Sequence, residues 1–309
     1  MAKTGTKEYL GELRVVGEID LKQFWPGGKS DGDTVVVRIK NDGFAFSPNP
    51  ESKPFKPTTV FQGATLNKKP VIHKGGKLSV RLQGIDTTEL HYRDYSNQIG
   101  PKGNVEYRQF VAETGATKLH DFLAEAGSGQ VVDCMLTTRV DTPTQVFDVY
   151  ARFIGDIVMR KANRDVNVNG WMVEQGWAFP AFYTTMRNDE IRALQSQAKK
   201  AQKAQGAANR VWGQRAGHVT QLDVTMRYRP NGPFNAQKDI GTVLMPKLFR
   251  RQVLFVISVL NRKFAGTYAQ YLAKKKKPPD SWLSASAFLK NRGAKREPNL
   301  ARLFDGDRW

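Results

Sequence analysis

The chain has 309 residues, of which 40% are hydrophobic and 25% are charged, a composition that disfavours a disordered chain, a collagen and a membrane protein. Its one cysteine, Cys134, excludes internal disulfides and cysteine-rich zinc sites. The 48 Lys and Arg residues outnumber the 29 Asp and Glu residues and give a net charge of +19. Such a charge attracts polyanions through counterion release, so nucleic acid is the leading expected partner, ahead of an anionic membrane surface.

The amino-terminal residues MAKTGTKEYLGELRVV lack the apolar stretch of a secretory signal. We therefore predict a cytoplasmic location, with export by a non-standard route as the alternative. The most apolar window, Val253–Leu260, is much shorter than the roughly 20 residues of a membrane-spanning helix. It predicts a buried helix, and we expect no membrane partner.

The first half of the chain is rich in β-branched runs bounded by turn-forming residues, which predict strands. These runs are Leu13–Ile19, Thr34–Ile39, Leu78–Ile85, Val131–Thr138 and Val146–Val158. They favour an antiparallel barrel or meander, with Asp141–Thr144 as the turn between the last two strands. The proline-rich stretch Asn41–Lys77 predicts a long loop with at most a short hairpin.

Helical spacing of apolar residues appears at Thr117–Ala126, Asn169–Gly176 and Asn188–Gln205. Strands with interleaved helices in this proportion predict the α+β class. Further along, Lys247–Lys263 and Ser284–Asn291 also have helical patterns, and Lys274–Lys277 is typical of an exposed connector.

The composition changes after Trp212. Residues 218–309 hold 18 Lys and Arg against 6 Asp and Glu, so this segment carries +12 of the net charge. We predict two domains, 1–217 and a basic, helical domain of unknown function at 218–309. Within the second domain, Lys274, Lys275, Lys276 and Lys277 are either nucleic-acid contacts or a solvated charge run.

Three short stretches hold residue types that suit phosphodiester hydrolysis. Asp31–Val35 (DGDTV) lies at the start of a predicted strand. Arg81 lies on a strand, and Asp86 and Glu89 follow at its end. In Asp148–Arg152 (DVYAR), strand alternation predicts that Asp148, Tyr150 and Arg152 share one face.

Each of these groups has a chemical role in such a reaction. The carboxylates of Asp33 and Asp86 and the carbonyl of Thr87 are oxygen ligands of the kind that Ca²⁺ prefers. Glu89 is placed to orient or deprotonate an attacking water. Arg81 and Arg152 carry planar guanidinium groups that match two phosphate oxygens each.

These stretches resemble those of the thermonucleases, the staphylococcal nuclease family, over about residues 10–213. The family order also includes Val173–Ala178 (VEQGWA) and a last helix rich in Ala, Gln and Lys that ends at Val211-Trp212. The resemblance implies an OB-type five-stranded barrel with three helices and one Ca²⁺ ion. It also implies hydrolysis of DNA and RNA that leaves 3′-phosphate ends.

The resemblance assigns a role to each matching residue. Asp33, Asp86 and Thr87 match the calcium ligands, Glu89 the catalytic glutamate, Arg81 and Arg152 the phosphate-binding arginines, and Tyr150 a tyrosine that contacts the phosphate. Phe182 and Tyr183 match an aromatic pair, which makes Tyr183 a candidate nucleic-acid contact. Thr88 replaces a usual proline, so we expect a looser turn before Glu89. The segment after residue 217 has no recognised counterpart.

Two functions follow from this pattern. The first is a calcium-dependent, sugar-nonspecific nuclease with DNA and RNA as partners. The alternative is a non-catalytic module on the same fold that binds nucleic acid or another partner. Single residues also have simpler interpretations, since Arg81 and Arg152 are otherwise edge charges on strands and Tyr150 a cross-strand packing residue. The joint presence of two arginines, two aspartates and a glutamate favours the nuclease.

Overall fold

The structure is a computed structural model. It describes residues 11–40, 45–48, 65–66, 69–93, 105–127, 129–140, 146–182, 186–204, 210–212, 225–230, 232–240 and 245–275. The predicted turn Asp141–Thr144 and the predicted helix Ser284–Asn291 lie outside these ranges.

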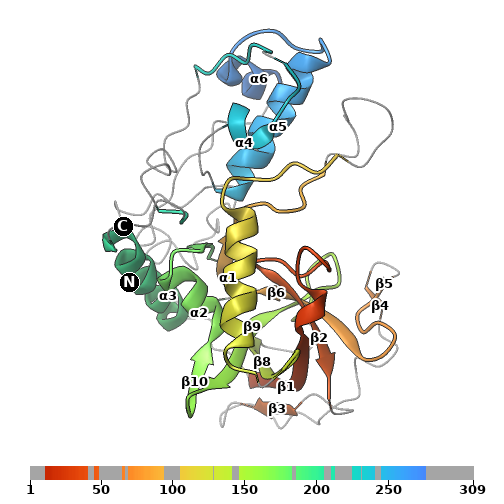
Figure 1. Ribbon diagram of the computed structural model, residues 1–309, viewed down its shortest axis with the longest axis vertical. Helices are drawn as coiled ribbons and strands as arrows, with labels where there is room; N and C mark the ends of the chain where they lie inside the picture. Colours follow the sequence, from red (N-terminus) through yellow and green to blue (C-terminus); the bar gives the residue numbers. More distant parts are fainter. Residues whose placement is uncertain are drawn as a thin grey trace, which may run out of the picture.

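Five strands of the described chain close a barrel (Figure 1). They are β1 (Gly11–Asp20), β2 (Thr34–Ile39), β6 (Lys77–Leu82), β8 (Val131–Val140) and β9 (Phe153–Lys161). Strand β1 pairs with β2 and β8, β2 with β6, and β8 with β9, all antiparallel, and β6 closes the ring beside β9 in parallel. The barrel and its helices confirm the predicted OB-type α+β fold.

Shorter strands extend the barrel. β3 (Ala45–Pro48) pairs with β1, and β10 (Arg164–Asn167) pairs with β9. β4 (Thr65–Leu66) and β5 (Lys69–Pro70) form a short pairing of the kind expected within Asn41–Lys77. β3 lies in the same stretch and pairs with β1, so the prediction of a loop with at most a short hairpin is wrong there. β7 (Ile85–Thr87) pairs with β11 (Ala178–Pro180), which connects the turn after β6 to the segment that follows the second helix. A short 3-10 helix, η1 (Leu21–Gln23), follows β1.

Alternation of burial explains why the barrel strands form where they do. In β9, Phe153, Gly155, Ile157 and Met159 are buried, and the residues that alternate with them are partly exposed. The strand predicted from Val146 starts only at Phe153, because the preceding residues form a turn closed by a hydrogen bond from Ala151 N–H to the Asp148 carbonyl at 2.9 Å. That part of the prediction is wrong.

Three helices pack on the barrel: α1 (Ala112–Ala124), α2 (Val168–Glu174) and α3 (Asn188–Lys203). The apolar stripe predicted for α3 is buried at Ile191, Leu194 and Ala198. Helix α1 starts five residues before its predicted start, because small residues such as Ala112 and Ala116 continue its buried face.

The last described helices are α4 (Ala236–Asp239), α5 (Pro246–Leu260) and α6 (Tyr268–Lys274), which lie beyond the barrel at one end of the molecule (Figure 1). Two buried clusters hold α5. One contains Leu248, Phe249, Val253 and Ile257 together with Tyr107, Val111, Phe179 and Val211. The other joins Phe255 and Val256 to α6. Residues on both sides of position 217 thus share one apolar cluster, and the division into domains at 217 stays a prediction.

Of the helices in the described part of the chain, none is long and apolar enough to cross a membrane.

Candidate active site

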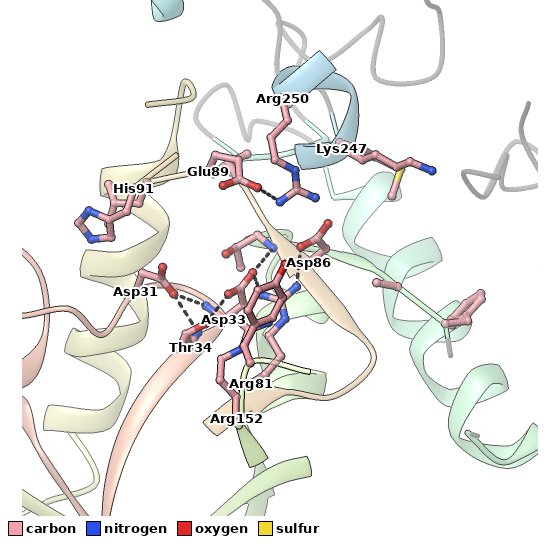
Figure 2. Close-up of a pocket in the computed structure, with 17 residues that line it drawn as sticks. Asp31, Asp33, Thr34, Arg81, Asp86, Glu89, His91, Arg152, Lys247 and Arg250 are labelled. Atoms are coloured by element: carbon pink, nitrogen blue, oxygen red, sulfur yellow. Dashed lines mark hydrogen bonds and ion pairs between the residues drawn. The ribbon is translucent and has the colours of Figure 1, made fainter. Parts of the chain in front are cut away.

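The residues predicted for catalysis and metal binding converge, together with Tyr150 of the predicted nucleic-acid contacts. A cavity of about 720 Å³ is lined by Asp33, Arg81, Asp86, Thr87, Glu89, Tyr150 and Arg152, among others (Figure 2). Three stretches that are far apart in the sequence therefore meet in one place, as their chemistry requires.

A tight turn before β2 positions Asp33. The Asp31 carboxylate accepts hydrogen bonds from the N–H groups of Asp33 at 3.1 Å and Thr34 at 2.8 Å. Gly32 is needed here because a Cβ at this position would lie 2.9 Å from the Thr87 side chain. Thr87 N–H in turn donates to Asp33 Oδ2 at 3.2 Å, which joins the first motif to the second.

The turn between β6 and β7 brings Arg81 back to Asp86. Gly84 adopts φ +76°, a left-handed conformation that side chains rarely take. Arg81 Nη2 then forms an ion pair with Asp86 Oδ1 at 2.6 Å and donates to the Ile85 carbonyl at 3.3 Å. Arg81 Nη1 pairs with Asp33 Oδ2, so a single guanidinium bridges both aspartates.

Burial and neighbouring charges shift the pKa values of Asp31, Asp33 and Asp86 by different balances. Burial would raise the pKa of Asp33, but the ion pair with Arg81 and the hydrogen bonds from Thr87 and Thr34 hold that pKa below its ordinary value. Burial raises the pKa of Asp86 although Arg81 opposes it. Burial and the neighbouring Asp33 charge raise the pKa of Asp31 to about 7. The arginine thus fully stabilises only one of the three carboxylates.

Glu89 lies opposite the aspartates and is held through its backbone. Its N–H donates to Gln109 Oε1 at 2.8 Å, and its carbonyl accepts from Gln109 N–H at 2.8 Å. These two bonds hold the Glu89 backbone in place, and the looser turn expected from Thr88 stays a prediction. The Glu89 carboxylate pairs with Arg250 of α5 (Figure 2). Burial nevertheless raises the pKa of Glu89 to about 8.

Arg152 reaches the cavity from a turn and not from one face of a strand. The Asp148 carboxylate accepts hydrogen bonds from the N–H groups of Tyr150 and Arg152, both at 2.9 Å, and from Arg152 Nε at 2.8 Å. Ala151 has φ +65°, so the chain reverses between Asp148 and Arg152. The prediction that Asp148, Tyr150 and Arg152 alternate along a strand is therefore wrong, although all three do meet, with the Arg152 guanidinium 5.4 Å from the Tyr150 ring centre.

The donor groups around Asp33 and Asp86 suit a hard cation. Their side-chain ligand atoms are all oxygen, the donor that a hard cation prefers. Within the described ranges, no group of three or more His, Cys, Asp or Glu side chains gathers as a metal site. Two carboxylates and the Thr87 carbonyl fit a cation that takes its remaining ligands from water.

Other predicted contacts lie elsewhere. Lys274 and Lys275 are at the end of α6, where their ammonium groups lie 5.8 Å from the ring centres of Phe264 and Tyr271 respectively, and neither lysine lines the cavity. Tyr183, Lys276 and Lys277 lie outside the described residues. Phe182, the other member of the predicted aromatic pair, does line the cavity and is buried.

Two cationic residues of the cavity wall, and one residue that holds Glu89, were not predicted from the sequence. Arg250 and Lys247 of α5 line the cavity, although Arg250 is 161 positions from Glu89 in the chain. The charge pattern of the second half pointed to the lysine run instead. Gln109, which anchors Glu89, carries no signal in a single sequence beyond its place three residues before helix α1.

A comparison with protein families matches residues 79–207 to the family described as staphylococcal nuclease homologue. No curated protein matches the chain. The matched range contains Arg81, Asp86, Glu89 and Arg152, while Asp33 and helix α5 lie outside it. Residues 79–207 of this chain are thus similar to the staphylococcal nuclease homologue family, the one that the sequence motifs resemble.

Proposed function

We propose that the protein is a calcium-dependent, sugar-nonspecific nuclease that hydrolyses DNA and RNA and leaves 3′-phosphate ends. One observation carries this proposal: two arginines, two aspartates and a glutamate from separate parts of the chain line a single cavity. Hydrolysis of a phosphodiester needs a proton acceptor for water and positive charge around the phosphate. The cavity holds groups of both kinds.

Glu89 is the proposed proton acceptor. Its pKa of about 8 lies close to neutral pH, where a general base transfers protons efficiently. Gln109 fixes the backbone on both sides of the glutamate side chain, which limits where the carboxylate can reach. A water molecule between Glu89 and the phosphate would give its proton to Glu89 as its oxygen attacks phosphorus. The bond between phosphorus and the 5′-oxygen would break, and the 5′-oxygen would leave as a hydroxyl with a proton taken from solvent.

Arg81 and Arg152 are the proposed phosphate ligands. Both are oriented before substrate arrives, Arg81 by Asp33 and Asp86, and Arg152 by Asp148 and by Thr34 Oγ1 at 3.4 Å. Donors that are already in place stabilise the negative charge of a transition state without reorganisation. Asp33, Asp86 and the Thr87 carbonyl would hold Ca²⁺, which when bound supplies further positive charge at a phosphate oxygen.

A binding module without catalysis is the second candidate. It is favoured by the way the cavity's carboxylates are paired, since Arg81 takes both aspartates and Arg250 takes Glu89. In that arrangement the chain itself neutralises the charges that a metal and a water would otherwise use. Such a protein would bind nucleic acid in the cavity and leave it intact.

Digestion of plasmid DNA and of RNA separates the two candidates. We expect the wild type to degrade both in Ca²⁺ and neither in EGTA, and Glu89→Gln to lose at least about 10²-fold in rate. Glu174→Gln is the matched control, because Glu174 lies on the surface of α2 and pairs with Lys200 at 3.4 Å. Tight binding of nucleic acid by a wild type that does not cleave in Ca²⁺ would favour the binding module.

A further inference from the structure

Helix α5 adds two cations to a cavity that otherwise belongs to the barrel. Lys247 and Arg250 are three positions apart, so they share one face of α5, and both line the cavity. Figure 2 shows this helix above the carboxylates, with Arg250 extending toward Glu89. The family match ends at residue 207, so these two residues are additions to the matched domain.

The three arginines of the cavity differ in how far their side chains are exposed. Arg81 is 13% exposed and is held by two aspartates, and Arg152 is 30% exposed and is held by Asp148. Arg250 is 42% exposed, while the Glu89 side chain that it contacts is only 16% exposed. The side chain of Arg250 is therefore the most exposed of these three arginines.

The pair between Arg250 and Glu89 also conflicts with the proposed role of Glu89. A carboxylate oxygen that accepts from a guanidinium has less capacity left to accept from water. A guanidinium forms strong bidentate bonds with phosphate as well as with carboxylate. A phosphate that binds Arg250 can thus replace the glutamate without leaving the arginine unpaired.

On the basis of the proposed nuclease function, we propose that Arg250 and Lys247 form a second phosphate subsite, which takes a backbone phosphate next to the scissile one and thereby releases Glu89 from Arg250. The substrate of the site is then a polynucleotide, DNA or RNA, and not a dinucleotide. A polynucleotide that fills the subsite makes Glu89 available to water. Helix α5 thus couples binding of the nucleic acid to release of the proposed general base.

Binding measured in EDTA tests the subsite without any cleavage. Fluorescence anisotropy with labelled decathymidylate and decauridylate compares four proteins: wild type, Glu89→Gln, Arg250→Gln and the double variant. In Glu89→Gln, Arg250 has lost its carboxylate partner and a negative charge has left the cavity. We expect this variant to bind both decamers about tenfold more tightly than the wild type. Adding Arg250→Gln should cancel that gain.

Two further measurements test whether Lys247 contacts a phosphate and whether the tighter binding needs more than one phosphate. Lys247→Gln should lower the slope of log affinity against log salt by about 0.7, the value for one contact with a single strand. Lys263→Gln is the control, because Lys263 lies on the surface just after α5 and does not line the cavity. Dithymidylate, with one phosphodiester, should bind the Glu89→Gln protein and the double variant to within about twofold of each other, because it cannot fill two phosphate sites.

The results also separate this proposal from the proposed function. If Arg250→Gln leaves decamer affinity unchanged in the Glu89→Gln background, Arg250 serves only to neutralise Glu89 and the subsite is refuted. Arg250→Lys, which keeps the charge and loses the fork, repeats the test should Arg250→Gln melt early. A wild type that never cleaves, but whose Glu89→Gln variant shows the Arg250-dependent gain, would refute the nuclease and support the phosphate subsite.

Discussion

Arg152 offers the clearest substitution in the site, because its guanidinium makes one strong ion pair, with Asp148 at 2.8 Å. Arg152→Lys keeps the charge but loses the planar fork that matches two phosphate oxygens. We expect kcat/KM on single-stranded DNA to fall about 10²-fold while the melting temperature changes little. Arg164→Lys on the exposed strand β10 is the control. Cleavage at the wild-type rate would remove Arg152 from the proposed mechanism.

The raised pKa of Asp156 in β9 predicts how the free energy of unfolding changes with pH. Burial raises its pKa from the ordinary 3.8 to about 7, with a further contribution from the charge of Glu190. Between pH 4 and pH 7 the folded protein holds a proton that the unfolded chain releases, so the free energy of unfolding falls as the pH rises through this range.

Asp156→Asn removes that proton uptake. In urea unfolding we expect the variant to be more stable than the wild type at pH 8, by more than about 1 kcal/mol, and the difference to shrink toward pH 4. Asp165→Asn, on the exposed part of β10, should leave the pH profile unchanged. Parallel profiles for wild type and Asp156→Asn would show that Asp156 is ionised across the range.

Residues that belong to short motifs are the ones whose place in the cavity was predicted from the sequence. Asp33, Arg81, Asp86 and Glu89 meet because short turns hold them in order, and such turns leave a clear pattern of Gly, Asp and Thr. The strand predicted through the DVYAR stretch is wrong because alternating residues are as compatible with a turn as with a strand. The positive φ of Ala151, which makes the turn, is not signalled by alanine.

The turn between β6 and β7 positions two residues of the cavity, Arg81 and Asp86, next to each other. Gly84 has φ +76°, and a Cβ there would lie 2.5 Å from Leu194 Cδ1 of α3 and 2.8 Å from Met186 Cε. Gly84→Ala should therefore destabilise the protein by about 1–3 kcal/mol and lower activity.

Gly75→Ala is the matched control for this substitution. Gly75 has a nearly equal φ of +78°, but nothing lies within 4 Å of a Cβ at that position. Urea unfolding of the two variants separates backbone strain, which both share, from the clash with α3. Equal losses of stability would mean that the contact with α3 adds nothing to the cost of Gly84→Ala.

Elements with strong local patterns were predicted to within a few residues. Strand β2 was predicted with its observed bounds, and α3 begins at its predicted residue, because β-branched runs and apolar stripes determine such elements locally. The short strands β7 and β11 have three residues each and exist through their pairing with one another. Contacts of that kind depend on tertiary structure and leave no periodic signal.

The contacts between the barrel and the last helices bear on the predicted division at residue 217, which stays a prediction. The charge boundary at residue 217 predicts a separable basic domain, yet Phe179 and Val211 share a buried cluster with Phe249 and Val253 of α5. Deleting residues 218–309 would expose the barrel side of this cluster. Burial of each such large side chain is worth about 1.5–3 kcal/mol.

We therefore expect a chain truncated after residue 217 to melt several degrees below the full chain and to aggregate on heating. A chain truncated after residue 275 is the control, because it keeps the described helices α5 and α6. Melting temperature and light scattering of both are the measurements. A 1–217 chain that is as stable and soluble as the full chain would support the division at 217.

The ion pair between Glu89 and Arg250 joins an early part of the chain to a late one. During synthesis the barrel residues leave the ribosome first, and amino-terminal units generally fold before the remainder is made. Until α5 has emerged, the cavity lacks the wall formed by Met245, Lys247 and Arg250, and Glu89 lacks this partner. A nascent chain and a finished one thus present different cavities to the RNA that surrounds every ribosome.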